Sequence, residues 1–191
     1  MSDHYFTDIG VYLIDIPASL YLFALMLRFL LQWVEADFYN PISQFLVTLT
    51  HPPLRYLRRF IPSVRRIDTA SLVLMLAVQV MADYLIFVLQ QISFSPVSLL
   101  VVALGHLLEL LYNILFYSIL ISLLLSWVPP RGNYPAVSLL YDLTDPVLGF
   151  FRRFLPPVGG IDLSPLLALF ALQFAKMAIM PLLQQFITVM N

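Results

Sequence analysis

The sequence predicts an all-α membrane protein with four transmembrane helices, built as a tandem repeat of helix, amphipathic hairpin and helix. Three observations lead to this prediction. The chain is 61% hydrophobic and only 11% charged, whereas soluble domains have about 45–50% apolar and about 25% charged residues. Long apolar runs alternate with proline-rich basic loops. The segment from Trp33 to Leu72 also recurs from Trp127 to Leu166, at a constant offset of 94 residues.

The two copies of this segment align without a gap and share 16 of 40 residues. A self-match at a fixed period indicates one supersecondary unit used twice. We therefore divide the chain into a first repeat, residues 1–95, and a second repeat, residues 96–191. The shared residues include Trp33/Trp127, Pro41/Pro135, Thr50/Thr144, Pro52/Pro146, Arg58/Arg152, Arg59/Arg153, Phe60/Phe154, Pro62/Pro156, Ile67/Ile161 and Asp68/Asp162.

The first repeat is predicted to span the membrane over residues 11–34 and 69–94, with a loop over residues 35–67 between the spans. A bilayer core needs about 20 residues of helix, and both runs exceed that length. The acidic start of the chain lacks the basic region of a signal peptide, so we expect the first span to be uncleaved. Asp68 stands where it would cap the second span.

The second repeat is predicted to follow the same order, with spans at about 107–128 and 163–189 and a loop over 129–161. Asp162 is the corresponding cap. The apolar run before this repeat's first span is longer than one crossing requires. We expect residues 97–108 either to extend the helix beyond the membrane or to bend at Gly105.

Each loop is predicted to contain two short amphipathic helices. In the first loop, Asn40-Pro41 is a typical helix start, and His51-Pro52-Pro53 is expected to end that helix. In the second loop, Tyr134-Pro135 and Asp145-Pro146 stand at the same places. Because each piece is too short to cross a bilayer, we expect it to lie in the interface plane with its apolar side chains toward the membrane.

The basic residues predict which side of the membrane the loops occupy. Each repeat contains two spans, so both loops must face the same side. Positively charged loops are retained in the cytoplasm, so we expect both loops to be cytoplasmic and both termini to be outside. Eight of the ten basic residues are in the loops: Arg55, Arg58, Arg59, Arg65, Arg66, Arg131, Arg152 and Arg153.

The repeated Arg-Arg-Phe sequences, Arg58-Arg59-Phe60 and Arg152-Arg153-Phe154, are the candidate contact residues. One interpretation is ordinary retention at anionic headgroups, where each arginine contributes about 1 kcal/mol near the surface. The other is a docking surface for an acidic cytoplasmic partner. The fixed spacing to the following Pro and Ile-Asp argues for a defined hairpin geometry, which either interpretation accommodates.

Asp83 and Lys176 are the candidate midspan ion pair. They lie 15 and 14 residues beyond the two predicted caps, which is roughly 21–22 Å along a helix. Because they have opposite charge at one depth, we hypothesise that the second and fourth spans face each other and that these side chains pair. A structural pair is favoured over an ion pathway, although intramembrane charges often mark function.

The other ionisable residues of the apolar runs are expected to be structural. Asp15 and Glu109 are predicted to lie at the outer interface in contact with water. Arg28 is within reach of the cytoplasmic headgroups by snorkelling, and His106 lies outside the predicted span.

The sequence contains no cysteine, which excludes disulfides, thiolate metal sites and cysteine nucleophiles. The three histidines have no ligand spacing, and no phosphate-cradling glycine loop or Ser-His-acid arrangement is evident. We therefore expect no enzymatic activity, no cofactor and no metal. The expected partners are membrane lipids, an unidentified cytoplasmic or membrane protein, and further copies of the chain in a homo-oligomer, but not nucleic acid directly.

The repeated motifs resemble those of the YggT family of small bacterial and plastid membrane proteins. The first copy carries the Asn-Pro pair, Thr50-His51-Pro52 and Arg58 to Pro62, followed by Ile67-Asp68; the second carries Thr144-Asp145-Pro146 and Arg152 to Pro156, followed by Gly159 to Asp162. The first copy departs from the pattern at Arg65-Arg66, where the second has Gly159-Gly160.

This resemblance implies a protein of the bacterial inner membrane, in the two-copy form of the longer proteobacterial members. Family members are linked to osmotic-stress tolerance, to cell division and nucleoid organisation, and in plastids to cytochrome assembly. The leading hypothesis is a non-enzymatic scaffold or assembly factor. The alternative is an oligomeric ion or solute transport protein involved in osmotic homeostasis.

Overall fold

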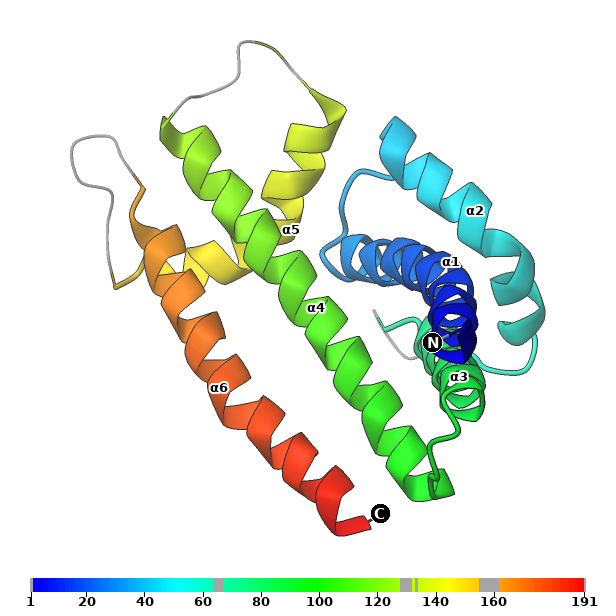
Figure 1. Ribbon diagram of the computed structural model, residues 1–191. Coiled ribbons are helices and arrows are strands. Elements are labelled where there is room, and N and C mark those ends of the chain that lie inside the picture. Colours follow the sequence, from blue (N-terminus) through cyan, green and yellow to red (C-terminus); the bar gives the residue numbers. More distant parts are fainter. Residues whose placement is uncertain (1, 64–66, 128–131, 133, 155–161, 191) are drawn as a thin grey trace.

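The computed structural model describes residues 2–63, 67–127, 132, 134–154 and 162–190. These residues form helices and no strands, which confirms the predicted all-α class (Figure 1). The helices are α1 (Ser2–Trp33), α2 (Pro41–Leu57), α3 (Thr69–Leu89), α4 (Pro96–Trp127), α5 (Pro135–Phe151) and α6 (Ser164–Met190).

Four of these helices, α1, α3, α4 and α6, are long and apolar enough to cross a membrane. Only 6–22% of the residues in their most apolar windows are buried within the protein. Most of their side chains therefore face outward, as expected of helices whose apolar surface is covered by lipid. The prediction of four spans is confirmed in number and order.

The ends of the long helices differ from the predicted bounds. Helix α1 begins at Ser2 rather than near residue 11, and α3 ends at Leu89 rather than at residue 94. Helix α4 is continuous from Pro96 through Gly105 to Trp127. Hydropathy locates the lipid-crossing part of a helix, whereas the helix itself continues until its backbone hydrogen bonding ends.

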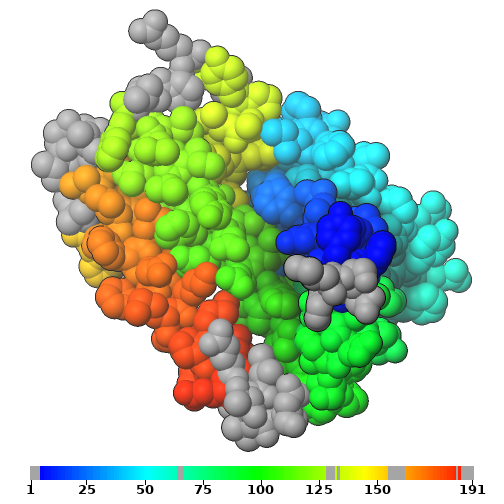
Figure 2. Space-filling model, viewed as in Figure 1, coloured from blue at the N-terminus to red at the C-terminus, as the bar shows by residue number. Residues whose placement is uncertain are grey.

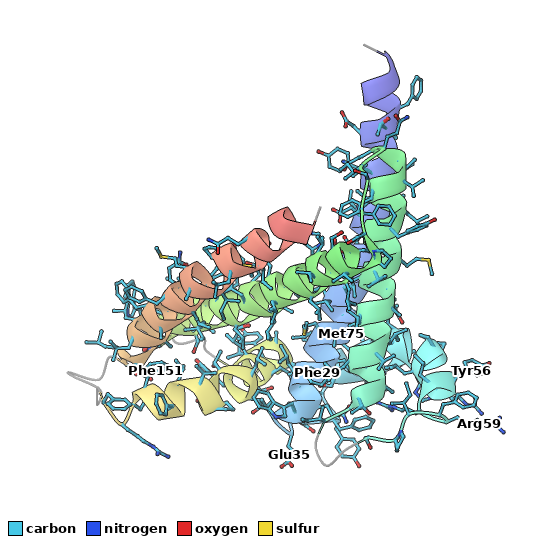
Figure 3. All side chains as sticks on the ribbon, turned by 90° about the horizontal axis from the view of Figure 1, so that it is seen from below. Phe29, Glu35, Tyr56, Arg59, Met75 and Phe151 are labelled. Atoms are coloured by element: carbon cyan, nitrogen blue, oxygen red, sulfur yellow. The ribbon has the colours of Figure 1, made fainter. Side chains whose placement is uncertain are left out.

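The long helices form two antiparallel pairs, α1 with α3 and α4 with α6. Figures 1 and 3 show that the two pairs are steeply inclined to each other. Helix α4 contacts both pairs and lies centrally on the face shown in Figure 2. Its 32 residues extend about 48 Å, which exceeds the roughly 30 Å hydrocarbon core. This length suits a strongly tilted crossing, whereas α3 matches the core directly.

Equivalent residues build a small core in each repeat. Leu25, Leu54 and Leu74 belong to the core of the first repeat. Their counterparts 94 residues later, Ile119, Leu148 and Ala168, form a core cluster in the second. In each case the middle residue comes from the short helix, so α2 and α5 are packed onto their own helix pair by the same contacts.

The short helices α2 and α5 are each continuous over 17 residues. The prediction that His51-Pro52-Pro53 and Asp145-Pro146 end a helix is therefore wrong. A proline removes one backbone hydrogen bond and bends a helix without always ending it, and Figure 1 shows that the ribbons of both helices change direction along their length.

Helices α2 and α5 lie at the same end of the molecule and contact each other (Figure 3). Asn40 joins them. Its Oδ1 accepts a hydrogen bond from Ile42 N at 2.9 Å, which confirms the predicted cap of α2, and its Nδ2 donates to Pro135 O at 2.8 Å. The equivalent residue Tyr134 makes no side-chain cap. One asparagine therefore both starts α2 and holds it against the start of α5.

Candidate lipid and partner contact site

The first arginine of each repeated pair binds an aspartate within its own repeat. We call Arg58 and Arg152 the inner arginines. Arg58 Nη2 donates to Asp68 Oδ2 at the start of α3. Arg152 Nε donates to Asp162 Oδ2 at 2.9 Å before α6, and its Nη1 donates to Asp145 Oδ1 at 3.1 Å. The same salt bridge therefore ties the end of each short helix to the following span.

The aspartates of these bridges stay ionised because hydrogen bonds outweigh their burial. Burial opposes ionisation of Asp68, but hydrogen bonds from Arg58 and Ser71 hold its pKa below the ordinary value. For Asp162, burial is likewise overcome by Ser164 and Arg152, and the pKa is also lowered. Both bridges are thus present as ion pairs at neutral pH.

The two predicted caps behave differently. Asp68 stands at the N-cap position of α3, but its side chain makes no cap hydrogen bond; Oδ2 accepts from the Ser71 hydroxyl at 2.6 Å instead. Asp162 Oδ1 accepts from the Ser164 backbone N–H at 2.9 Å, so the predicted cap of α6 is confirmed. Asp68 therefore binds Arg58 and Ser71 through one oxygen, whereas Asp162 binds its arginine and caps α6 through different oxygens.

The second arginine of each pair takes no part in these bridges. We call Arg59 and Arg153 the outer arginines. Both are exposed, and Figure 3 shows Arg59 at the edge of the molecule beside Tyr56. The adjacent Phe60 and Phe154 are 79% and 67% exposed. Each short helix therefore ends in an exposed cation next to an exposed aromatic ring.

The predicted pair between Asp83 and Lys176 is wrong. Helices α3 and α6 make no contact over the described residues. Asp83 is buried and lies 3.0 Å from His106 Nδ1 on α4, and Gln79 Nε2 donates to it at 3.0 Å. The prediction failed because it assumed that equivalent spans face each other, whereas α4 lies between them.

Lys176 forms a separate cluster between α4 and α6. Its Nζ donates to Glu109 Oε1 at 2.9 Å and lies 4.6 Å from the centre of the Tyr112 ring. Tyr112 in turn donates to Gln173 Oε1 at 2.6 Å. Glu109, expected as a water-facing acid, is 47% exposed and also accepts a hydrogen bond from this lysine. Every ionisable side chain of these two clusters has a partner, as intramembrane charges require.

Arg28 does not snorkel to the headgroups as expected. Its side chain is buried, and Nη1 donates to Thr50 Oγ1 at 2.6 Å beneath α2. Sequence reasoning missed the partners of Arg28 and His106, because each residue meets its partner only when two consecutive helices pack together. The sequence did contain one indication that Arg28 has a role specific to the first repeat. The equivalent position of the second repeat, 122, holds a serine.

Four long apolar helices with internally paired charges, together with two amphipathic helices at one end, define a multi-pass α-helical membrane protein. The sequence model of the CCB3/YggT family matches residues 7–100 and, separately, residues 101–183. The chain belongs to this family.

Several relatives cover nearly the whole chain. It is 40% identical to the uncharacterized protein PA0392 of Pseudomonas aeruginosa over 180 residues, which cover 89% of this chain and 87% of the relative. It is 35% identical to the uncharacterized protein YggT of Escherichia coli over 173 residues, or 91% and 90% of the two chains. It is also 46% identical to YlmG homolog protein 2, chloroplastic, of Arabidopsis thaliana over 61 residues, covering 31% and 24%. No solved structure matches.

Proposed function

We propose that the protein is a non-enzymatic scaffold or assembly factor of the bacterial inner membrane. In this proposal the two short helices present the outer arginines, Arg59 and Arg153, to anionic headgroups and to a protein partner in the cytoplasm. The observation that carries this proposal is that the two arginines of each pair differ in their contacts. The inner arginine fixes the geometry through an intramolecular salt bridge, while its neighbour and the following phenylalanine stay exposed.

This arrangement suits docking better than simple charge retention. Retention needs positive charge near the surface in any geometry, whereas here the same exposed Arg-Phe pair recurs at the end of two packed helices. An exposed aromatic ring beside an arginine is also the composition typical of interface hot spots. Partner contact would cover Phe60 and Phe154, which otherwise expose large apolar surfaces.

The proposed orientation places α2 and α5 in the cytoplasm and both termini outside. It is supported by the contact between α2 and α5 and by the concentration of arginine in the two loops. The chain has no cysteine, so single introduced cysteines report the topology directly. We expect Phe60→Cys and Phe154→Cys to react with a membrane-impermeant maleimide only after the cells are opened. Labelling of either position in intact cells would contradict the orientation.

The family resemblance supports a role in osmotic-stress tolerance or cell division. The test is complementation of a deletion strain grown at high osmolarity, with cell length scored in parallel. We expect combined Arg59→Glu and Arg153→Glu to lower survival at least tenfold with normal protein abundance. Arg55→Glu, an exposed arginine of α2 outside the repeated Arg-Arg-Phe sequence, is the matched control and should complement. Full complementation by the double charge reversal would reject the proposal.

A transport function is the second candidate, because the buried Asp83 carboxylate contacts His106 between two of the membrane-spanning helices. Four spans make a thin pore, so such a protein would act as an oligomer. The measurement is potassium flux from proteoliposomes under an osmotic gradient. Flux that disappears with Asp83→Asn would favour transport, whereas tight vesicles containing folded protein would favour the scaffold.

A further inference from the structure

A cavity of about 630 Å³ that is lined in part by charged side chains lies between the end of α1, the inner side of α2 and the start of α3. Its lining includes three basic side chains, Arg28, His51 and Arg58, together with Ser43 and Asp68. The other large cavities described between the helices are lined mainly by leucine, isoleucine and aromatic side chains. This cavity is therefore distinct in chemistry from the grooves that face lipid tails.

Arg28 is the buried cation of this cavity. Its side chain is 7% exposed, and its one hydrogen bond within the described chain goes to the uncharged hydroxyl of Thr50. Two acids, Glu35 and Asp68, also line the cavity, and Asp68 is bound directly by Arg58. A buried charge is costly unless it is paired and hydrogen-bonded. An anionic group in the cavity would give Arg28 a charged hydrogen-bond partner of its own.

Two further polar atoms of the lining lack a hydrogen-bond partner within the described residues. They are the Ser43 hydroxyl and Oδ1 of Asp68, and both are buried. Unsatisfied buried groups are rare and usually mark a ligand, an ion or water. The serine hydroxyl can donate to an anion, whereas the carboxylate oxygen needs a donor. The complementary ligand therefore carries both an anionic oxygen and a hydrogen-bond donor.

The second repeat does not reproduce these features. Ser122 and Val137 stand at the positions of Arg28 and Ser43. In addition, Asp162 accepts hydrogen bonds on both of its oxygens, from Ser164 and from Arg152. The repeat unit thus folds without a buried arginine, so the charge in the first repeat is not required by the architecture.

The position of Arg28 indicates the kind of ligand. It lies five residues before Trp33, or about 7.5 Å along α1, and tryptophan is typical of the membrane interface. We propose that the cavity binds one phospholipid headgroup, with phosphodiester oxygens at Arg28 and Ser43 and a terminal hydroxyl or ammonium group at Asp68. The site requires only that α1 spans the membrane and does not depend on docking by the outer arginines.

Native mass spectrometry of the purified protein tests this proposal by titration with phosphatidylglycerol, phosphatidylethanolamine and phosphatidylcholine of equal chain length. The first two headgroups end in a donor, whereas the quaternary ammonium of choline has none. We expect one saturable lipid per chain, at least tenfold tighter for phosphatidylglycerol or phosphatidylethanolamine than for phosphatidylcholine. Equal affinity for all three would overturn the assignment.

Substitutions in the cavity lining test whether the lipid binds in this cavity. Arg28→Met should weaken lipid binding at least tenfold. Ser43→Ala should weaken it severalfold. Because Ser43→Ala removes only one hydroxyl, it keeps the test valid if Arg28→Met fails to fold. The matched control Ser122→Ala, which removes a hydroxyl at the second-repeat position equivalent to Arg28, should bind normally. Unchanged affinity in both cavity variants would refute the site. Displacement of the lipid by inorganic phosphate at comparable concentrations would refute the headgroup assignment.

Discussion

The salt bridges of the two repeats are predicted to contribute unequally to stability. We consider Arg58→Met and Arg152→Met, which each remove the inner arginine and keep side-chain volume. In the first repeat the change leaves a carboxylate whose side chain is only 1% exposed. In the second, the unpaired Asp162 is 23% exposed. Both acids keep a hydrogen bond from a serine, Ser71 or Ser164. The burial of the acid that is left behind therefore decides the cost.

Removing one partner of a fully buried ion pair costs about 3–5 kcal/mol. The Arg58 side chain is 35% exposed, and solvent screens it, so we lower the expected cost to about 2 kcal/mol. Arg152 is 42% exposed, which places its bridge among surface pairs worth about 0–1 kcal/mol. Arg58→Met should therefore destabilise the protein by at least about 1 kcal/mol more than Arg152→Met.

The assay is reversible unfolding in mixed micelles with increasing SDS, followed by far-UV circular dichroism. Arg59→Met is the control, since it removes an exposed neighbour and should change the unfolding free energy by less than about 0.5 kcal/mol. Equal losses for Arg58→Met and Arg152→Met would refute the reasoning from burial. An unchanged midpoint for both would show that neither bridge holds its short helix to the following span.

Two further predictions follow from the polar contacts. A double-mutant cycle of unfolding free energies between Asp83→Asn and His106→Gln should give a coupling energy of about 0.5–3 kcal/mol. The same cycle between Asp83→Asn and Lys176→Met should give no coupling. Coupling in the second cycle would support the rejected pair between Asp83 and Lys176. Because the folded-state pKa values of Asp68 and Asp162 are lowered, their stabilisation is present above the unfolded pKa near 3.8 and lost as the pH falls through the folded value. Unfolding midpoints measured from pH 7 to pH 3 should therefore drop at the acidic end, and Asp68→Asn should flatten that drop; an identical drop in the variant would contradict the assignment.

The sequence predicted the elements that depend on local pattern. Hydropathy located the four long helices, and the Asn40-Pro41 pair located the start of α2, because caps and apolar runs act within a few residues. The predicted helix ends at Pro52, Pro53 and Pro146 were wrong, because α2 and α5 continue through these prolines. A kinked helix and two separate helices have the same local signals, and packing of Leu54 and Leu148 into the core decides between them.

The roles of the repeated arginines were predictable only in part. The repeated Arg-Arg-Phe spacing singled out the residues of the proposed contact site, but did not indicate that one arginine of each pair is bound to an aspartate ten residues later. The partners of Asp83 and Lys176 were mispredicted for a different reason. Depth in the membrane follows from spacing along one helix, whereas the neighbour of a helix is set by packing that an internal repeat does not determine.

Photo-crosslinking in living cells tests the central claim most directly. A photoreactive phenylalanine analogue replaces Phe60 or Phe154 in the proposed contact site, and Phe170, 63% exposed on α6, serves as the membrane-facing control. The proposal predicts a discrete protein adduct at Phe60 or Phe154 that disappears when Arg59 and Arg153 are changed to Glu, and no such adduct at Phe170. Adducts with lipid alone at all three positions would contradict a docking function for the short helices.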